Sequence, residues 1–178
     1  MILLADKVIT KLLYIYRHRL IKKKTGSAPK KIYGNVHIIN KNIKFGENVA
    51  LYPEVMIFGD GPVVIGDNVN IGNGTMIYSS KNGGGVYIGN NTMIAAQSYI
   101  IDMDHGIKRN ELIRNQKNTA APIHIGEDVW IAANCTVLKG SIIEDGAIIG
   151  AKSLVKGKIE KSAIAVGIPA KVLKYREQ

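Results

Sequence analysis

Residues Ile125–Glu160 read IGEDVW-IAANCT-VLKGSI-IEDGAI-IGAKSL-VKGKIE, a run of six consecutive six-residue blocks. Each block opens with isoleucine or valine and carries a small or β-branched residue at its fifth position. An α-helical stripe has a period near 3.6 residues and ordinary hairpins are less regular, so neither explains a period of six. The pattern indicates a repeat protein in which every block is one structural unit.

The same pattern extends toward the N-terminus. Six more blocks begin at Phe45, Leu51, Ile65, Ile71, Ile88 and Ile94. Glycine, asparagine and aspartate populate the corners, where the chain needs unusual φ/ψ values or local side-chain hydrogen bonds. We interpret each block as a short strand plus a corner, so that three blocks close a triangular coil and stacked coils pair their strands in parallel. The opening residues should then form an interior ladder with the small fifth residues beside them.

With these blocks the sequence resembles the hexapeptide-repeat acyltransferases, which include galactoside, maltose, serine and xenobiotic acetyltransferases. The resemblance covers roughly residues 35–174. It implies a mainly β fold, a left-handed parallel β-helix with a long loop protruding from its coils. We expect residues 1–30 to form an N-terminal basic helix with a linker. Residues 31–178 should form the acyltransferase domain, with the extended loop at about 102–124.

Helical periodicity is confined to the N-terminal region, where Leu4, Val8, Leu12, Ile15 and Tyr16 fall near one face. Lys7 and Lys11 fall on other faces, and the helix continues through the basic residues Arg17, Arg19, Lys22, Lys23 and Lys24. Two interpretations stay open. The helix covers the open end of the coils, which we favour because exposed strand edges need protection, or it attaches to an anionic membrane surface. Charges interrupt the apolar run too early for a membrane span, so we expect a cytoplasmic protein, with the inner face of the membrane as a second location.

Composition narrows the range of partners. The net charge is +10, but no aromatic-basic platform or nucleic-acid motif accompanies it, so nucleic acid is not an expected partner. Small anionic ligands such as coenzyme A suit this charge better. The single cysteine, Cys135, occupies a small interior position of its block and is expected to be a structural thiol rather than a nucleophile.

The repeat is interrupted where loops must leave the coils. The interval from Ile77 to Ile88 contains Ser79–Gly85, and the interval from Ile100 to Ile125 begins IIDMDHG. Long loops on a rigid scaffold often carry function. His105 lies at the start of the second loop, and a neutral imidazole there can take the proton from a sugar hydroxyl that attacks a thioester. Either Asp102 or Asp104 is expected to orient the ring.

The family resemblance implies further roles. A histidine at this loop position is the general base of the resembling acetyltransferases, and a tryptophan at the place of Trp130 lines the cleft between subunits. Acceptor-site candidates are Asn73, Ser79, Ser80 and Trp130. Cofactor-binding candidates are Ala133, Ala151, Lys156 and Gly157 for the pantetheine arm, and Lys171 and Lys174 for the nucleotide phosphates. No metal is expected, because a zinc centre needs three converging ligands and the long loop separates His105 from His124.

These observations predict an acetyl-coenzyme A-dependent O-acetyltransferase that acts on a sugar hydroxyl in capsule, lipopolysaccharide or other envelope-glycan synthesis. The acetyl group should pass directly in a ternary complex. We expect a homotrimer with active sites between subunits, packed through a face on which Trp130, Tyr78, Tyr87 and Tyr99 are exposed. The alternatives are an N-acyltransferase for an amino-sugar nucleotide and a β-helix scaffold without catalytic activity.

Overall fold

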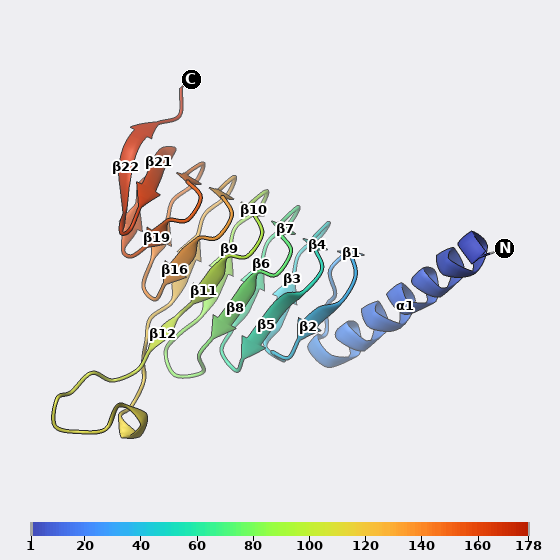
Figure 1. Cartoon of the computed structure of the whole chain (residues 1–178), viewed down its shortest axis with the longest axis horizontal. Helices are drawn as coiled ribbons and strands as arrows, with labels where there is room; N and C mark the ends of the chain where they lie inside the picture. The colour runs from blue at the N-terminus through green and yellow to red at the C-terminus, as the bar shows by residue number, and fades with distance from the viewer. Residues whose placement is uncertain (1, 178) are drawn as a thin grey trace.

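The computed structural model describes the backbone of residues 2–177 and the side chains of residues 8–177. Figure 1 shows a stack of short-stranded coils with helix α1 (Ile2–Thr25) at one end and a hairpin at the other. The chain moves from one sheet to the next after nearly every strand, and each strand pairs in parallel with the equivalent strand of the neighbouring coil. The parallel β-helix predicted from the repeat is therefore confirmed.

Three sheets form the sides of the coils. The first sheet contains β1 (Lys31–Ile32), β4 (Ala50–Leu51), β7 (Asn70–Ile71), β10 (Met93–Ile94), β15 (Trp130–Ile131), β18 (Ile148–Ile149), β21 (Ala163–Gly167) and the antiparallel β22 (Ala170–Tyr175). The second contains β2 (Val36–Ile38), β5 (Val55–Gly59), β8 (Met76–Ser79), β11 (Tyr99–Ile101), β16 (Thr136–Leu138) and β19 (Leu154–Val155). The third contains β3 (Ile43–Phe45), β6 (Val63–Ile65), β9 (Val86–Ile88), β14 (Ile123–Ile125), β17 (Ile142–Ile143) and β20 (Lys158–Ile159).

The interior has the composition that the blocks predict. Eleven of the twelve opening residues are buried, and Phe45 at the first block is half-buried. All twelve fifth positions are buried, including the polar Thr75, Thr92 and Ser98. Thr75 Oγ1 and Thr92 Oγ1 donate to the carbonyl groups of Ala95 and Gly126 in the next coil, at 3.0 and 2.9 Å. These hydroxyls are tolerated inside because each has a backbone partner.

The edge between the third and first sheets, called the third edge, is built from asparagine. Asn48, Asn68 and Asn91 have φ values of 55°, 58° and 59°, a region that asparagine adopts more readily than most residues. Their side-chain amides form a ladder, with Nδ2–Oδ1 distances of 3.0 and 3.1 Å between successive coils. The asparagines of the repeat thus supply both the corner conformation and a link from coil to coil.

One structural expectation is wrong. The aromatic residues assigned to a single exposed face lie on three: Trp130 is on the first sheet, Tyr78 and Tyr99 are on the second, and Tyr87 is on the third. Successive blocks belong to different sheets, so similar positions in neighbouring blocks face different directions. Only residues separated by whole coils share a face.

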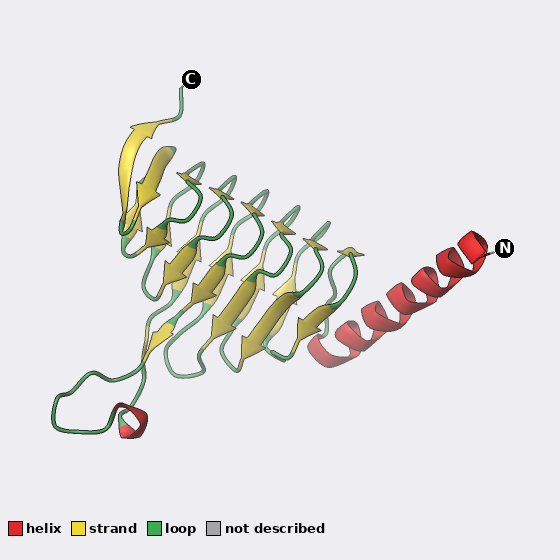
Figure 2. Cartoon of the chain, in the orientation of Figure 1, coloured by secondary structure: helices red, strands yellow, loops and turns green. Residues whose placement is uncertain are grey.

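Helix α1 covers part of the first coil and then extends beyond it (Figure 2). Ile21 belongs to the buried core and Tyr14 packs against it, whereas residues nearer the N-terminus have exposed apolar side chains. Among the described residues, no helix combines the length and apolar character that crossing a bilayer requires.

Candidate active site

Two loops leave the coils at the edge between the second and third sheets, called the second edge, and buried Asp102 joins them. Asp102 directly follows β11 and its side chain is fully buried. Its carboxylate accepts hydrogen bonds from Ser80 N (2.8 Å), Gly85 N (2.6 Å) and Ser79 Oγ (3.0 Å). Burial raises the pKa of Asp102 above its usual value, and these donors only partly offset that effect. Asp102 therefore fixes residues 79–85 to the foot of the long loop.

The glycines around this carboxylate leave no room for side chains. A Cβ added at Gly84 would overlap Oδ2 of Asp102, and one added at Gly61 would overlap the carbonyl oxygen of Ser80. Ser79 and Ser80 are themselves buried, and Ser79 Oγ also lies 2.9 Å from Pro62 O. The two serines that were predicted as acceptor-site candidates thus face the interior of the loop junction.

His105 lies just beyond this junction. It follows β12 (Met103–Asp104), which pairs with β13 (Thr119–Ala120) as a short antiparallel hairpin at the base of the loop. The imidazole is exposed, and it makes no hydrogen bond or ion pair with any described residue. Asp104 Oδ2 instead lies 3.4 Å from Lys139 Nζ, which donates to Thr119 Oγ1 at 2.6 Å. Neither predicted orienting carboxylate is bonded to His105 in this structure.

Gln116 organises the remainder of the loop, although the sequence offered no sign of this. Its buried side-chain oxygen accepts from Lys108 N at 2.6 Å, and its Nε2 donates to the carbonyl groups of Lys108 (2.8 Å) and Glu111 (2.7 Å). A lone glutamine in a polar stretch looks like a solvated residue. The loop surrounds a recess of about 610 Å³ that is lined by residues from Gly106 to Thr119.

The remaining predicted site residues are divided between two edges. Asn73, Ala133 and Ala151 lie on the edge between the first and second sheets, called the first edge, where Gln97 N donates to Asn73 O and Lys152 N to Ala133 O. Trp130, 46% exposed, is on β15 just before this edge. Lys156 and Gly157 follow β19 and lie on the second edge, as do the loop and His105. Within one chain, the whole second sheet separates the two groups.

Lys171 and Lys174 lie farther along the coil axis. Both are exposed on β22, which is antiparallel to β21 and pairs Val166 with Lys171 and Ile164 with Lys174. This hairpin ends the coil stack opposite α1 (Figure 1). The two ammonium groups are therefore available to an anionic ligand at this end of the coils.

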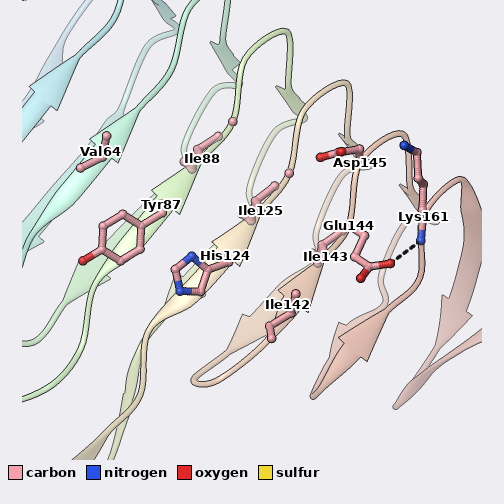
Figure 3. Close-up of a pocket in the computed structure, with 12 residues that line it drawn as sticks. Val64, Tyr87, Ile88, His124, Ile125, Ile142, Ile143, Glu144, Asp145 and Lys161 are labelled. Carbon is pink, nitrogen blue, oxygen red and sulfur yellow. Dashed lines mark hydrogen bonds between the residues drawn. The ribbon is translucent and has the colours of Figure 1, made fainter.

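A groove on the third sheet contains none of the predicted site residues. Figure 3 shows Tyr87 beside His124. The two rings are stacked, with their centroids 4.9 Å apart and an interplanar angle of 9°. Val64 and Ile142 continue this row of outward side chains on either side, and the groove has a volume of about 560 Å³. The sequence contained a weak signal, because Tyr87 and His124 each precede an interior isoleucine and must point outward.

The thiol of Cys135 lies inside the coils and not at these edges. Cys135 is buried, its Sγ lies 3.1 Å from Gly150 O, and burial raises the pKa of the thiol. A buried thiol with a raised pKa is a weak nucleophile. Among the described residues, no three His, Cys, Asp or Glu side chains gather as a metal-binding group.

The coils with two protruding loops define a β-helical protein, and the comparisons specify its family. Residues 122–157 match the model described as bacterial transferase hexapeptide (six repeats). The chain is 33% identical to the putative lipopolysaccharide biosynthesis O-acetyl transferase WbbJ of Escherichia coli, over 75% of this chain and 71% of that protein. It is 31% identical to the putative colanic acid biosynthesis acetyltransferase WcaF of the same species, over 75% and 69%.

A solved structure is similar over most of its length. The N-acyltransferase AntD from Bacillus cereus, in complex with dTDP and 3-hydroxybutyryl-CoA, superposes with a TM-score of 0.77 at 23% identity, covering 90% of this chain and 88% of AntD. This likeness concerns the fold, whereas the sequence matches above establish the family. The chain belongs to the hexapeptide-repeat acyltransferases, and it is an acyltransferase.

Proposed function

We propose that the protein is an acetyl-coenzyme A-dependent O-acetyltransferase that modifies a sugar hydroxyl during synthesis of an envelope glycan. The observation that carries this proposal is the environment of His105. The ring is exposed and has no bonding partner among the described residues, yet it stands on a hairpin whose foot is fixed by buried Asp102. WbbJ and WcaF, whose names refer to lipopolysaccharide and colanic acid biosynthesis, support the substrate class.

In the proposed reaction, neutral His105 takes the proton from the sugar hydroxyl as its oxygen attacks the thioester carbonyl. The tetrahedral intermediate collapses, the bond from carbon to sulfur breaks, and the departing thiolate receives the proton from the imidazolium. The products are the O-acetylated sugar and free coenzyme A, and no acyl-enzyme forms. Backbone N–H groups at the coil edges are the candidate donors to the oxyanion. Asp102 acts as a positioning residue, whereas exposed Asp104 is paired with Lys139.

The active site is proposed to form between the subunits of a homotrimer. In support, the outward side chains of the second sheet are largely apolar: Met56, Phe58, Met76, Tyr78, Tyr99, Ile101, Leu138 and Leu154. Three copies with this sheet toward a three-fold axis bring the first edge of one chain beside the second edge of the next. Ile107, Leu112 and Ile113 of the loop are 91%, 68% and 61% exposed, and a neighbouring chain would cover them.

This arrangement assigns acetyl-coenzyme A to the cleft between two chains. Backbone groups at Ala133 and Ala151 would hold the pantetheine arm on one side, and Lys156 and Gly157 would contribute from the second edge. Lys171 and Lys174 would pair with phosphates, since charge-assisted contacts to phosphate are strong. The bound acyl-coenzyme A of AntD, a protein of the same fold, is consistent with this assignment. We place the reaction in the cytoplasm, where acetyl-coenzyme A is available.

A second candidate is N-acylation of an amino-sugar nucleotide. It is favoured by the fold similarity to AntD, an N-acyltransferase bound to dTDP. An amine that is already neutral needs less help from a base than a hydroxyl does. The rate of O-acetylation should therefore depend more strongly on His105 than the rate of N-acylation.

The test is release of free thiol from acetyl-coenzyme A in the presence of sugars, nucleotide-sugars and glycan fragments. For O-acetylation, His105→Ala should lower the acceptor-dependent rate by about 10²- to 10⁴-fold. His124→Ala is the matched control, because this exposed histidine lies on the third sheet and should leave the rate unchanged.

Three other results would contradict parts of the proposal. Full activity of His105→Ala with a hydroxyl acceptor would exclude its role as the base. Turnover only with amino-sugar nucleotides would favour the second candidate. No binding of acetyl-coenzyme A, measured calorimetrically, would contradict its assignment as the acyl donor.

A further inference from the structure

Helix α1 uses one face to contact the coils. Tyr14, Arg17, Ile21 and Lys24 follow one another at intervals of three or four residues, so they share one side of the helix. Tyr14 Oη donates to Lys30 O, Arg17 Nη1 to Gly34 O at 2.7 Å, and Lys24 Nζ to Ile38 O at 2.9 Å. Ile21 is buried in the core between them. This face packs on part of the first coil, so the helix covers the end of the β-helix only in part.

Another side of α1 carries an apolar stripe that the chain leaves uncovered. The stripe consists of Val8, Ile9, Leu12, Leu13 and Tyr16, with exposed fractions of 53%, 54%, 61%, 44% and 64%. At 100° per residue these side chains cover one continuous arc outside the contact face, with Leu13 at the border between the two. The helix runs outward from the first coil, so the rest of the chain does not cover this arc (Figure 1). A contiguous exposed apolar stripe usually marks an interaction surface.

Positive charge surrounds the stripe. The helix contains seven basic residues and a single acidic one. Lys11 lies along one border of the stripe, and Arg19, Lys22 and Lys23 continue from its C-terminal end, all exposed. Long lysine and arginine stems can lie along an apolar surface and extend their charges to a more polar layer. A second copy of the same helix would bring like charges together, whereas an anionic lipid surface complements them.

We propose that α1 lies on the surface of an anionic bilayer, with the stripe in the boundary between headgroups and acyl chains and the basic residues at phosphate level. Apolar burial and attraction to anionic lipid together give such helices their affinity. Residues 1–30 then act as a membrane-binding unit, and residues 31–178 as the catalytic unit. This proposal does not depend on which acceptor the transferase uses.

The experiment is co-sedimentation of the full chain with vesicles of phosphatidylcholine containing phosphatidylglycerol and with vesicles of phosphatidylcholine alone. The protein should bind the anionic vesicles and not the neutral ones, and added salt should weaken binding. Leu12→Asp/Tyr16→Asp should lower the affinity by about tenfold or more. Lys22→Glu/Lys23→Glu should also weaken binding, with less dependence on salt. The matched control, Ile168→Asp/Leu173→Asp, changes two exposed apolar residues at the other end of the coils and should bind like the parent.

Far-UV circular dichroism and the melting temperature verify that each variant is folded. The proposal is overturned if the parent protein does not bind anionic vesicles, or if folded Leu12→Asp/Tyr16→Asp binds them equally well. It is also overturned if that variant forms a smaller oligomer in light scattering, because a second copy would then cover the stripe. Thiol release with a soluble acceptor should be unchanged in the stripe variant, which separates this test from that of the transferase reaction.

Discussion

Asp102 and His105 are three positions apart but occupy opposite environments. The carboxylate is buried among three donors, and the imidazole is exposed with no bonding partner in the part of the chain that the structure describes. The sequence predicted His105 as a base from its place at the start of a loop, and the exposure of its ring is consistent with that prediction. It did not predict the role of Asp102, because the donors come from residues 79–85 in the preceding coil.

We therefore expect replacement of Asp102 to lower the stability of the fold, because Asp102 bonds to the loop and does not take part in the proposed proton transfer. Asp102→Ala leaves Ser80 N, Gly85 N and Ser79 Oγ without their acceptor, and we expect the free energy of unfolding to fall by about 2–4 kcal/mol. Urea denaturation followed by circular dichroism measures the change. Asp104→Ala is the control, since its exposed pair with Lys139 should be worth at most about 1 kcal/mol. Equal effects of the two changes would show that Asp102 does not fix the loops.

At the scale of the structural element, both the corners and the strands link one coil to the next. Many strands are only two residues long, so each contributes few ladder hydrogen bonds. The corners add side-chain links such as the asparagine ladder of the third edge. The hexapeptide pattern predicted where these corners occur, because asparagine and glycine are the residues that most readily adopt the unusual backbone angles of a corner. The ladder itself depends on the alignment of residues from separate coils.

Two substitutions at Asn68 should separate the backbone effect from the ladder effect. Asn68→Gly keeps a φ of 58° accessible but removes both amide contacts, whereas Asn68→Ala also places a methyl group in the left-handed region. Because that conformation costs a residue with a Cβ about 1–2 kcal/mol, Asn68→Ala should be the less stable of the two by a similar amount. Urea unfolding of both variants provides the measurement. The ranking would be wrong if Asn68→Gly were the less stable.

At the scale of the whole molecule, the division of the predicted site between two edges is the main result. Trp130, Ala133 and Ala151 are on or beside the first edge, while His105 and Lys156 are on the second. A complete site in one chain would require a ligand that crosses the second sheet. In the proposed trimer, the first edge of one chain would lie beside the second edge of the next.

Mixing two inactive variants tests this arrangement. His105→Ala lacks the proposed base, and Ala151→Trp should block the cofactor beside the first edge. Unfolded together and refolded as mixed trimers, they should regain activity at about one quarter of the sites, because one edge comes from each chain. Refolded separately, each variant should remain inactive in the thiol-release assay. No recovery in the mixture, with trimers verified by light scattering, would place the whole site in a single chain.

By itself the sequence determined the parallel β-helix, its interior ladder, its corners and the family of the protein, because each six-residue block encodes burial and backbone angle through its own residues. It also indicated the helix and both loops. Only the tertiary structure decided that Asp102 is enclosed by Ser79, Ser80 and Gly85, that the exposed aromatic residues are on three different sheets, and that the site residues divide between two edges. These relations join positions from different coils, such as Ser79 and Asp102, which lie 23 residues apart. They depend on loop lengths and on the alignment of coils, which no single block contains.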